Sequence, residues 1–343
     1  MIVCYYHRKP HGNAFSIEGV FRAVCEALPS EFQAKEWFCR FHRGIAGRLY
    51  NVIEAAFRQG TINHVVGDVH YLVLSLPKRR TILTIHDCVS PRTLKGFKQF
   101  ALVLLWYKLP VARCAAVTTV SEFSKQEVLH YVHCAPERIR VIHDPVARQF
   151  VPDPKPFNVA CPIILQVGTG RNKNIPRVAE AIDGLRCHLD IIGRLDEPQR
   201  QVLSRHGISY SESWNLTTEQ VAERYRRCDL VVFASTYEGF GLPIVEANAT
   251  GRPVITSNIC SMPEIAGSAA CLVDPFDCTS VREGILRVIG DADYRSHLVA
   301  EGFENVKRFQ ADVIAAQYAV LYREVFSCVT RDVASMMRNT ARL

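Results

Sequence analysis

The sequence lacks the features that mark a membrane-spanning, disulfide-bonded or zinc-binding chain. Its longest uncharged apolar run beside a predicted helix, Phe100–Tyr107, is far shorter than the roughly 20 residues that a transmembrane helix needs. The thirteen cysteines are odd in number and form no Cys-x-x-Cys pair, and no His/Cys cluster has zinc-ligand spacing. The N-terminal residues show no signal-peptide pattern. We therefore expect a cytoplasmic protein with reduced thiols and no metal.

Two common phosphate-binding motifs are missing as well. A P-loop would need Gly-x4-Gly-Lys-Ser/Thr, which the chain does not contain. The Gly168-Thr-Gly170 sequence follows a predicted strand, but it lacks the third glycine and the downstream acidic residue of a dinucleotide-binding fingerprint. These absences argue against a P-loop nucleotide hydrolase and against a dehydrogenase.

The length and composition indicate a folded protein with two domains. The 343 residues are 48% hydrophobic and 22% charged, and the length suits two domains of roughly 150 residues. Both halves alternate short apolar strands with amphipathic helices, which is typical of doubly wound α/β domains. A proline-rich stretch at 146–162 indicates the linker. We predict domains at 1–150 and 151–311, with a C-terminal helix at about 312–343.

The individual elements follow from short apolar runs and from apolar residues spaced by three and four positions. The predicted strands are 2–6, 63–66, 81–85, 115–120, 139–142, 163–167, 189–192, 230–234, 253–256 and 270–273. The predicted helices are 15–28, 48–58, 122–131, 175–183, 197–205, 218–227, 242–250, 281–289 and 312–326, with Ser121 as a cap.

The positive charge is concentrated in the first half of the chain. Residues 1–150 contain 20 Lys/Arg and 11 Asp/Glu, whereas residues 151–343 contain 21 and 23. One explanation is an ordinary solvated surface. The other is that the first domain faces an anionic partner, such as lipid headgroups or a lipid-phosphate acceptor. Nucleic acid is not expected, because no binding motif accompanies the charge.

The most informative stretch is 235–277, in which two glutamates stand eight residues apart around a Gly-Phe-Gly-Leu-Pro core. The apolar run Asp229–Ala234 predicts a buried strand, two glycines then permit a tight turn, and Pro243 suits the first turn of a helix. The amides and dipole at a helix N-terminus attract phosphate. Because Glu238 precedes this anion site and Glu246 follows it, both carboxylates suit the hydroxyls of an attached sugar. The pattern indicates a nucleotide sugar.

A second loop offers cations for the same ligand. Gln166-Val-Gly-Thr-Gly-Arg-Asn-Lys-Asn174 ends a predicted buried strand and places Arg171 and Lys173 around Asn172. Loops at the carboxyl ends of strands are where open α/β sheets bind ligands, and two cations there could clamp a diphosphate. The alternative is a solvated turn with two surface cations.

The stretch around Glu238 and Glu246 resembles the retaining glycosyltransferases of family 4, which have the GT-B fold. The resemblance continues through Gly251-Arg-Pro-Val254, Met262-Pro-Glu264 and Val273-Asp-Pro275. It implies an α/β fold of two Rossmann-like domains facing a central cleft, with the last helix crossing back to the first domain. It also implies that cationic side chains and a helix dipole replace the divalent metal of other transferases.

The resemblance assigns further residues. His86 ends a predicted strand where family members often place a histidine that faces the donor sugar, and Asp87 is expected to orient the next turn. Gly12 and Asn13 hold the place of the family's glycine loop, although its glycine-rich run is missing. Candidate catalytic residues are Glu238, His86 and Lys173; candidate substrate-binding residues are Gly12, Asn13, Thr169, Gly170, Arg171, Lys173, Glu238, Gly239, Phe240, Gly241, Leu242 and Glu246.

The predicted function is transfer of a hexose, mannose or glucose, from a nucleoside diphosphate sugar to a saccharide or lipid-linked acceptor with retention. The donor is a substrate, so no cofactor is expected. The predicted partners are this donor, the acceptor and an anionic membrane surface that would hold the protein peripherally.

Asp291-Ala-Asp293 has the spacing of a metal motif but is interpreted as a helix cap. Alternative hypotheses are a non-catalytic nucleotide-sugar-binding subunit and a nucleotide-sugar epimerase of the same fold.

Overall fold

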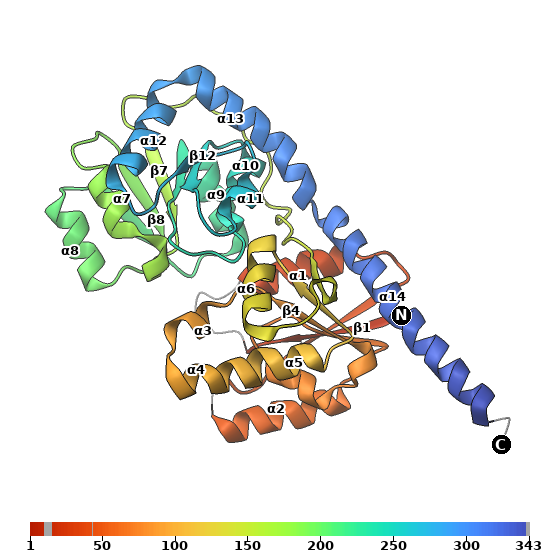
Figure 1. Cartoon of the computed structure of the whole chain (residues 1–343). Coiled ribbons are helices and arrows are strands. Elements are labelled where there is room, and N and C mark those ends of the chain that lie inside the picture. Colours follow the sequence, from red (N-terminus) through yellow and green to blue (C-terminus); the bar gives the residue numbers. More distant parts are fainter. Residues whose placement is uncertain (10–15, 43, 341–343) are drawn as a thin grey trace. The chain divides into compact units, whose positions relative to one another are not determined.

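The computed structural model describes residues 1–9, 16–42 and 44–340, which form two compact units. The first unit contains Met1–His143 and Ala311–Leu343, and the second contains Asp144–Gln310. The chain therefore passes into the second unit after His143 and returns to the first at Ala311 (Figure 1). The sequence predicts these two crossings after residues 150 and 311.

The first unit is built on a parallel six-stranded sheet. Its strand order is β2-β1-β3-β4-β5-β6, so the chain reverses its direction of travel across the sheet between β1 and β3. The loops that follow β1 and β3 therefore leave the same edge at neighbouring positions. The strands are β1 (Ile2–His7), β2 (Gln33–Phe38), β3 (Ile62–Val65), β4 (Thr81–Ile85), β5 (Ala116–Thr119) and β6 (Ile139–Val141).

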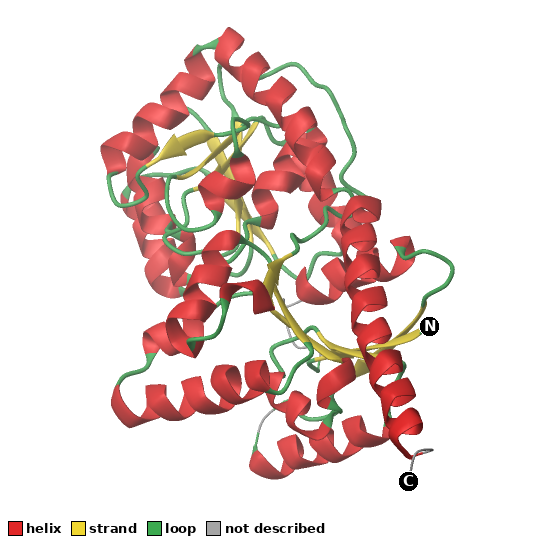
Figure 2. Ribbon diagram, turned by 45° about the vertical axis from the view of Figure 1, so that its right-hand side comes forward, coloured by secondary structure: helices red, strands yellow, loops and turns green. Residues whose placement is uncertain are grey.

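Helices cover this sheet, and Figure 2 shows them flanking the yellow strands. They are α1 (Ser16–Ala27), α2 (Ile45–Phe57), α3 (Val89–Thr93), α4 (Gly96–Leu102), α5 (Leu109–Ala112), α6 (Glu122–Val132) and α14 (Ala311–Thr340). A π-helix, Val103–Lys108, joins α4 to α5, and short 3-10 helices form at His70–Ser75, Lys78–Arg80 and Pro136–Arg138. Within the described ranges, no helix is both long enough and apolar enough to cross a bilayer.

A buried polar chain attaches α14 to the first sheet. The Tyr322 hydroxyl lies 2.8 Å from Nδ1 of His64 and 2.9 Å from the hydroxyl of Tyr5. The other ring nitrogen of His64 lies 2.7 Å from the Thr84 hydroxyl, which in turn lies 2.6 Å from that of Thr118. Burial holds the pKa of His64 well below its usual value, so the imidazole is neutral. The C-terminal helix is thus part of the first unit.

The second unit has its own parallel six-stranded sheet, with the order β12-β11-β10-β7-β8-β9. This is the Rossmann order. The chain moves outward from β7 to β9 and then continues from β10, which pairs with the other side of β7. The strands are β7 (Ile163–Val167), β8 (His188–Ile192), β9 (Tyr210–Ser213), β10 (Leu230–Phe233), β11 (Val254–Ser257) and β12 (Cys271–Val273). The helices are α7 (Ile175–Ala181), α8 (Glu197–Arg205), α9 (Thr218–Arg227), α10 (Leu242–Thr250), α11 (Met262–Ala266), α12 (Cys278–Gly290) and α13 (Ala292–Asn305), with one-turn helices at Arg171–Lys173 and Val306–Phe309.

Strand β10 explains why the sequence shows an uninterrupted apolar run. Leu230 and Val232 belong to the core cluster that includes residues of α7 and α12. Val231 and Phe233 are equally buried but lie outside that cluster, as alternation along a strand requires. A strand covered on both faces needs apolar residues at every position. This rigid strand delivers the chain to the loop that carries Glu238.

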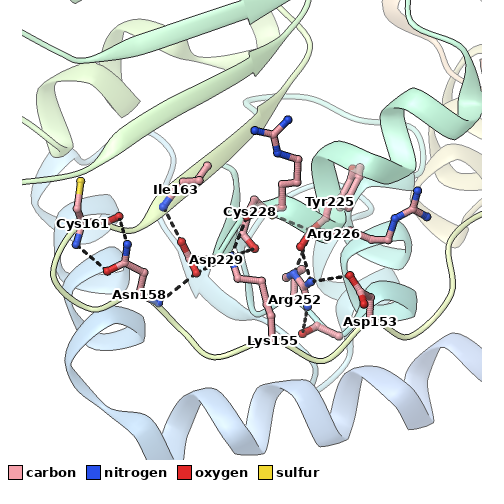
Figure 3. Close-up of polar contacts among 12 residues, drawn as sticks. Asp153, Lys155, Asn158, Cys161, Ile163, Tyr225, Arg226, Cys228, Asp229 and Arg252 are labelled. Carbon is pink, nitrogen blue, oxygen red and sulfur yellow. Dashed lines mark hydrogen bonds and ion pairs between the residues drawn. The ribbon is translucent and has the colours of Figure 1, made fainter.

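The linker that enters the second unit is held by Asp229, the residue before β10 (Figure 3). The backbone N–H groups of Asn158 and Ile163 donate to its carboxylate at 3.1 and 2.8 Å. Lys155 Nζ lies 2.9 Å from the same carboxylate, whose side chain is 1% exposed. One buried acid therefore fixes the start of β7 against the start of β10.

Replacing Asp229 by alanine should lower the free energy of unfolding by about 3 kcal/mol, because two N–H groups and Lys155 lose their partner. Chemical denaturation followed by circular dichroism measures this. The control is Asp153→Ala, whose half-exposed carboxylate lies 3.7 Å from Arg252 and should cost under about 1 kcal/mol. Equal losses in both variants would contradict the role given to Asp229.

Candidate active site

Two loops meet at the edge of the second sheet where the strand order changes. Because β7 and β10 are paired neighbours, the segments that follow them, 168–174 and 234–241, begin side by side. The backbone N–H of Thr236 donates to the carbonyl of Asn172 at 2.8 Å and joins the two segments directly. Open α/β sheets bind ligands at this kind of position. The structure thus brings together the two stretches that the sequence selected separately.

The loop after β7 is shaped by Gly168 and closed by Lys173. Gly168 has a φ of +88°, and a Cβ there would lie 2.8 Å from Cε of Lys173. Thr169 does not extend into solvent, because its hydroxyl donates to the carbonyl of Arg194 at 2.9 Å. Gly170 and Arg171, in contrast, are exposed. Of the two predicted cations, Lys173 is therefore the one that is held in place.

Lys173 forms an ion pair with Glu238. Its Nζ lies 2.7 Å from Oε1 of Glu238, and Nδ2 of Asn172 donates to the same oxygen at 3.0 Å. The ammonium group also lies 4.6 Å from the centre of the Phe233 ring, a distance typical of a cation–π contact. Both charged side chains are largely buried, with 19% and 15% of their surface exposed. A cation and a carboxylate are thus fixed in a partly desolvated position.

Ser261 fixes the turn that contains Glu238. Its hydroxyl lies 3.0 Å from the carbonyl of Glu238 and 2.7 Å from that of Phe240. The ring of Phe240 is buried and packs edge-on against Phe309, with their centres 5.7 Å apart. The Phe240 side chain therefore anchors the turn and is not available to a ligand. Gly239 lies between Glu238 and Phe240 and is partly exposed.

Helix α10 begins at this turn without a side-chain cap from any described residue. Gly241 precedes it with a φ of +115°, which is accessible mainly to glycine, and Pro243 occupies its first turn. Ile244 N–H already bonds to the carbonyl of Gly241. The amides at Gly241 and Leu242, together with the helix dipole, are therefore the groups of α10 that could receive an anion.

Glu246 lies one turn further along α10. Its Oε2 accepts a 2.6 Å hydrogen bond from the hydroxyl of Tyr225 on α9, whereas Oε1 has no hydrogen-bond partner among the described residues. Burial raises the pKa of Glu246 to about 7, although the bond from Tyr225 and the charge of Lys173 oppose the rise. This acid is thus poised to ionise near neutral pH and to accept a hydrogen bond at Oε1.

The remaining candidates belong to the first unit. His86 follows β4, its Nε2 lies 3.1 Å from the carbonyl of Val66, and its role toward a donor sugar stays a prediction. Gly12 and Asn13 lie outside the described residues. Asp87 accepts a hydrogen bond from Val89 N–H at 3.0 Å, which confirms its role in the following turn.

Residues outside the two loops also support the site, and no pattern in the sequence identifies them. Tyr225 bonds to Glu246 and Ser261 bonds to the turn that contains Glu238, yet neither residue belongs to a pattern that names such a partner. Asp291, in contrast, was interpreted correctly as a cap, because it accepts from Tyr294 N–H at 2.8 Å. In the described part of the chain, no group of three or more His, Cys, Asp or Glu is arranged to hold a metal.

The fold and this site define a protein of the GT-B class, and comparisons with known families agree. Residues 148–305 match the family model described as glycosyl transferases group 1, and residues 4–150 match glycosyltransferase family 4. The two models together extend over both units. The chain belongs to the family 4 glycosyltransferases.

Several relatives of known activity are similar over part of their length. O-antigen chain mannosyltransferase B of Escherichia coli is 27% identical, with 60% of each chain covered. The serotype-specific mannosyltransferase WbdA of Escherichia coli is 26% identical, and the match spans about a quarter of it (27%). O-antigen chain mannosyltransferase RfbU of Salmonella typhimurium is 26% identical, with 69% of this chain and 70% of that protein covered. The match thus spans less than two thirds of the first two of these relatives.

Solved structures share the fold at low sequence identity. Sucrose-phosphate synthase of Thermosynechococcus elongatus has a TM-score of 0.77 and 16% identity, covering 96% of this chain and 100% of that one. HepE of Anabaena, solved in complex with UDP and glucose, has a TM-score of 0.75 and 15% identity, covering 94% and 100%. Both are GT-B structures, so the predicted fold class is confirmed.

The raised pKa of Glu246 predicts pH-dependent binding of a nucleotide sugar. If ribose hydroxyls donate to the ionised carboxylate, affinity should increase up to about tenfold from pH 6 to pH 8, as the free acid ionises around its pKa of about 7. Isothermal titration at several pH values measures this, using a nucleotide sugar because its diphosphate does not titrate in this range. The affinity of Glu246→Gln should not change with pH over this range. If its affinity rose with pH as steeply as that of the unchanged protein, another group would be responsible for the pH dependence.

Proposed function

We propose that this protein is a retaining glycosyltransferase that transfers a hexose, mannose in particular, from a nucleoside diphosphate sugar to a saccharide or lipid-linked saccharide. The observation that carries this proposal is the Lys173–Glu238 pair beside the uncapped start of α10, at the switch point of the second sheet. The names of the similar mannosyltransferases support mannose over glucose, and their O-antigen roles support a place in polysaccharide synthesis.

In the proposed mechanism, the amides at the start of α10 and Lys173 bind the donor diphosphate, with Arg171 as an exposed second cation. Lys173 then exchanges part of its contact with Glu238 for phosphate oxygens. This releases Glu238 to accept hydrogen bonds from hydroxyls of the transferred sugar and to support positive charge at the anomeric carbon. As the diphosphate leaves the anomeric carbon, Lys173 and the amides stabilise the charge that develops on it, so a metal ion is not needed.

Glu246 would bind the ribose through Oε1, while Tyr225 keeps Oε2 in place. The proposed retention would follow from attack on the face that the diphosphate leaves. Positioning of donor and acceptor, rather than covalent chemistry by a side chain, would supply much of the acceleration. The sugar and ribose contacts thus depend on two carboxylates that are already held by neighbouring side chains.

The acceptor would bind to the first unit. Its sheet also has a switch point, between β1 and β3, and a cavity of about 300 Å³ opens there. The cavity is lined by cationic and aromatic side chains, which suit a phosphorylated or lipid-linked saccharide. Its lining includes Arg8, Lys9, Arg48, Asp68, Tyr71 and Trp106. A cytoplasmic location stays a prediction.

The test is transfer from a panel of UDP-, GDP- and ADP-sugars to saccharide acceptors. Glu238→Ala and Lys173→Ala should each lower turnover at least about a hundredfold, because one removes the sugar contact and the other a charge on the leaving diphosphate. Glu219→Ala changes an exposed acid of α9 and should leave the rate unchanged. Near-normal transfer by either site variant would contradict the assigned roles.

Product analysis separates the alternatives. A non-catalytic subunit would bind a nucleotide sugar, seen as a raised melting temperature, without any transfer. An epimerase would convert the donor in the absence of acceptor. Transfer that requires an acceptor, with a product that keeps the donor's anomeric configuration, would exclude both.

A further inference from the structure

Helix α2 of the first unit has large apolar side chains on the face that points away from the core. Ile45, Leu49, Ile53 and Phe57 follow one another at four-residue spacing and so form a stripe, and they are 87%, 58%, 53% and 84% exposed. The opposite face contributes Asn51 and Ala55 to the interior. A surface helix normally has the reverse arrangement, so this stripe requires a partner.

The segment from α4 to the start of α5 repeats this feature. Phe97 and Phe100 are 82% and 60% exposed, and Leu105 and Leu109 are exposed as well. From the same segment, Tyr107 enters the core. The apolar run around Phe100 therefore has one side in the core and one side exposed.

These two segments lie on the same side of the first unit. The guanidinium of Arg48 on α2 lies 4.8 Å from the ring centre of Trp106, in the π-helix that follows α4. Figures 1 and 2 both show α2 and α4 on one side of the first sheet. We call α2, the 3-10 helix His70–Ser75 and Gly96–Leu109 the apolar layer. It contains 10 of the 21 large apolar side chains exposed in the described chain, so the exposure is concentrated there.

The charge around the apolar layer is mainly positive, and one acid beside it, Asp68, accepts a hydrogen bond from Nε1 of Trp106 at 3.1 Å. Residues 88–121 contain five Lys/Arg and no Asp/Glu, and residues 37–67 contain four Arg and a single acid. That acid, Glu54, lies 3.6 Å from Arg40 and 3.7 Å from Arg58 and is thereby neutralised. Lys95 and Lys98 of the α4 region are exposed. The partner of this surface should therefore be both apolar and anionic.

We propose that the first unit docks on an anionic lipid bilayer through the apolar layer, with Ile45, Phe57, Phe97 and Phe100 inserted among the acyl chains. Helices that lie in a membrane interface combine an apolar face with Lys and Arg in this way, and the basic residues add attraction to anionic headgroups. Docking would present the basic cavity of the first unit to lipid-linked acceptors, a step that rests on the proposed function.

Vesicle flotation tests the docking without donor or acceptor. The protein should float with phosphatidylcholine vesicles that contain phosphatidylglycerol, and much less with pure phosphatidylcholine or at high salt. Ile45→Ser/Phe57→Ser and Phe97→Ser/Phe100→Ser should each lower the partition coefficient roughly tenfold or more, because two buried rings or chains are lost from the lipid contact. Lys95→Gln/Lys98→Gln should mainly reduce the dependence on salt.

The matched control is Val151→Ser/Leu286→Ser, which changes two exposed apolar residues of the second unit and should bind vesicles like the unchanged protein. Absence of flotation with anionic vesicles, or equal losses in this control, would overturn the proposal. So would a dimer, detected by light scattering, that the α2 and α4 variants abolish without any vesicle binding. Transfer to a water-soluble acceptor should survive in the α2 and α4 variants, so failure of docking and failure of the transferase proposal give different results.

Discussion

The parallel pairing of β7 with β10 is the constraint on which the candidate site depends. These strands are neighbours in space although more than sixty residues separate them in the chain, because the second sheet changes direction at this point. Their following loops therefore start side by side, and Lys173 of one meets Glu238 of the other at 2.7 Å. The site is a consequence of strand order, since neither loop contains both charges.

The same arrangement explains how the protein could manage negative charge with its own side chains. The ammonium group of Lys173 is restrained by Glu238 and by the ring of Phe233, so it loses little freedom when a ligand arrives. The start of α10 adds amides that no described side chain caps. Glu246, whose pKa is about 7, is partly protonated near neutral pH and so adds less than a full negative charge beside the start of α10.

Much of this could be predicted from the sequence, and the exceptions have physical causes. The Glu238 stretch and the Gly168 loop were identified because glycine, proline and buried-strand patterns are local. Strands β2 and β9 were missed because they are edge strands, whose residues are mostly exposed or half-buried and so lack an apolar run. Helix α13 was missed because its buried face is small, with Leu298 and Gly302 as its buried residues. Tyr225 and Ser261 could not be found, because contacts across 21 and 23 residues leave no local pattern.

The most direct test is an experimental structure of the second unit's site with a nucleoside diphosphate sugar bound. We expect diphosphate oxygens at the amides that begin α10 and near Nζ of Lys173, the ribose against Glu246, and Glu238 turned toward the sugar. A nucleotide bound elsewhere, with the 2.7 Å contact between Lys173 and Glu238 undisturbed, would contradict this expectation.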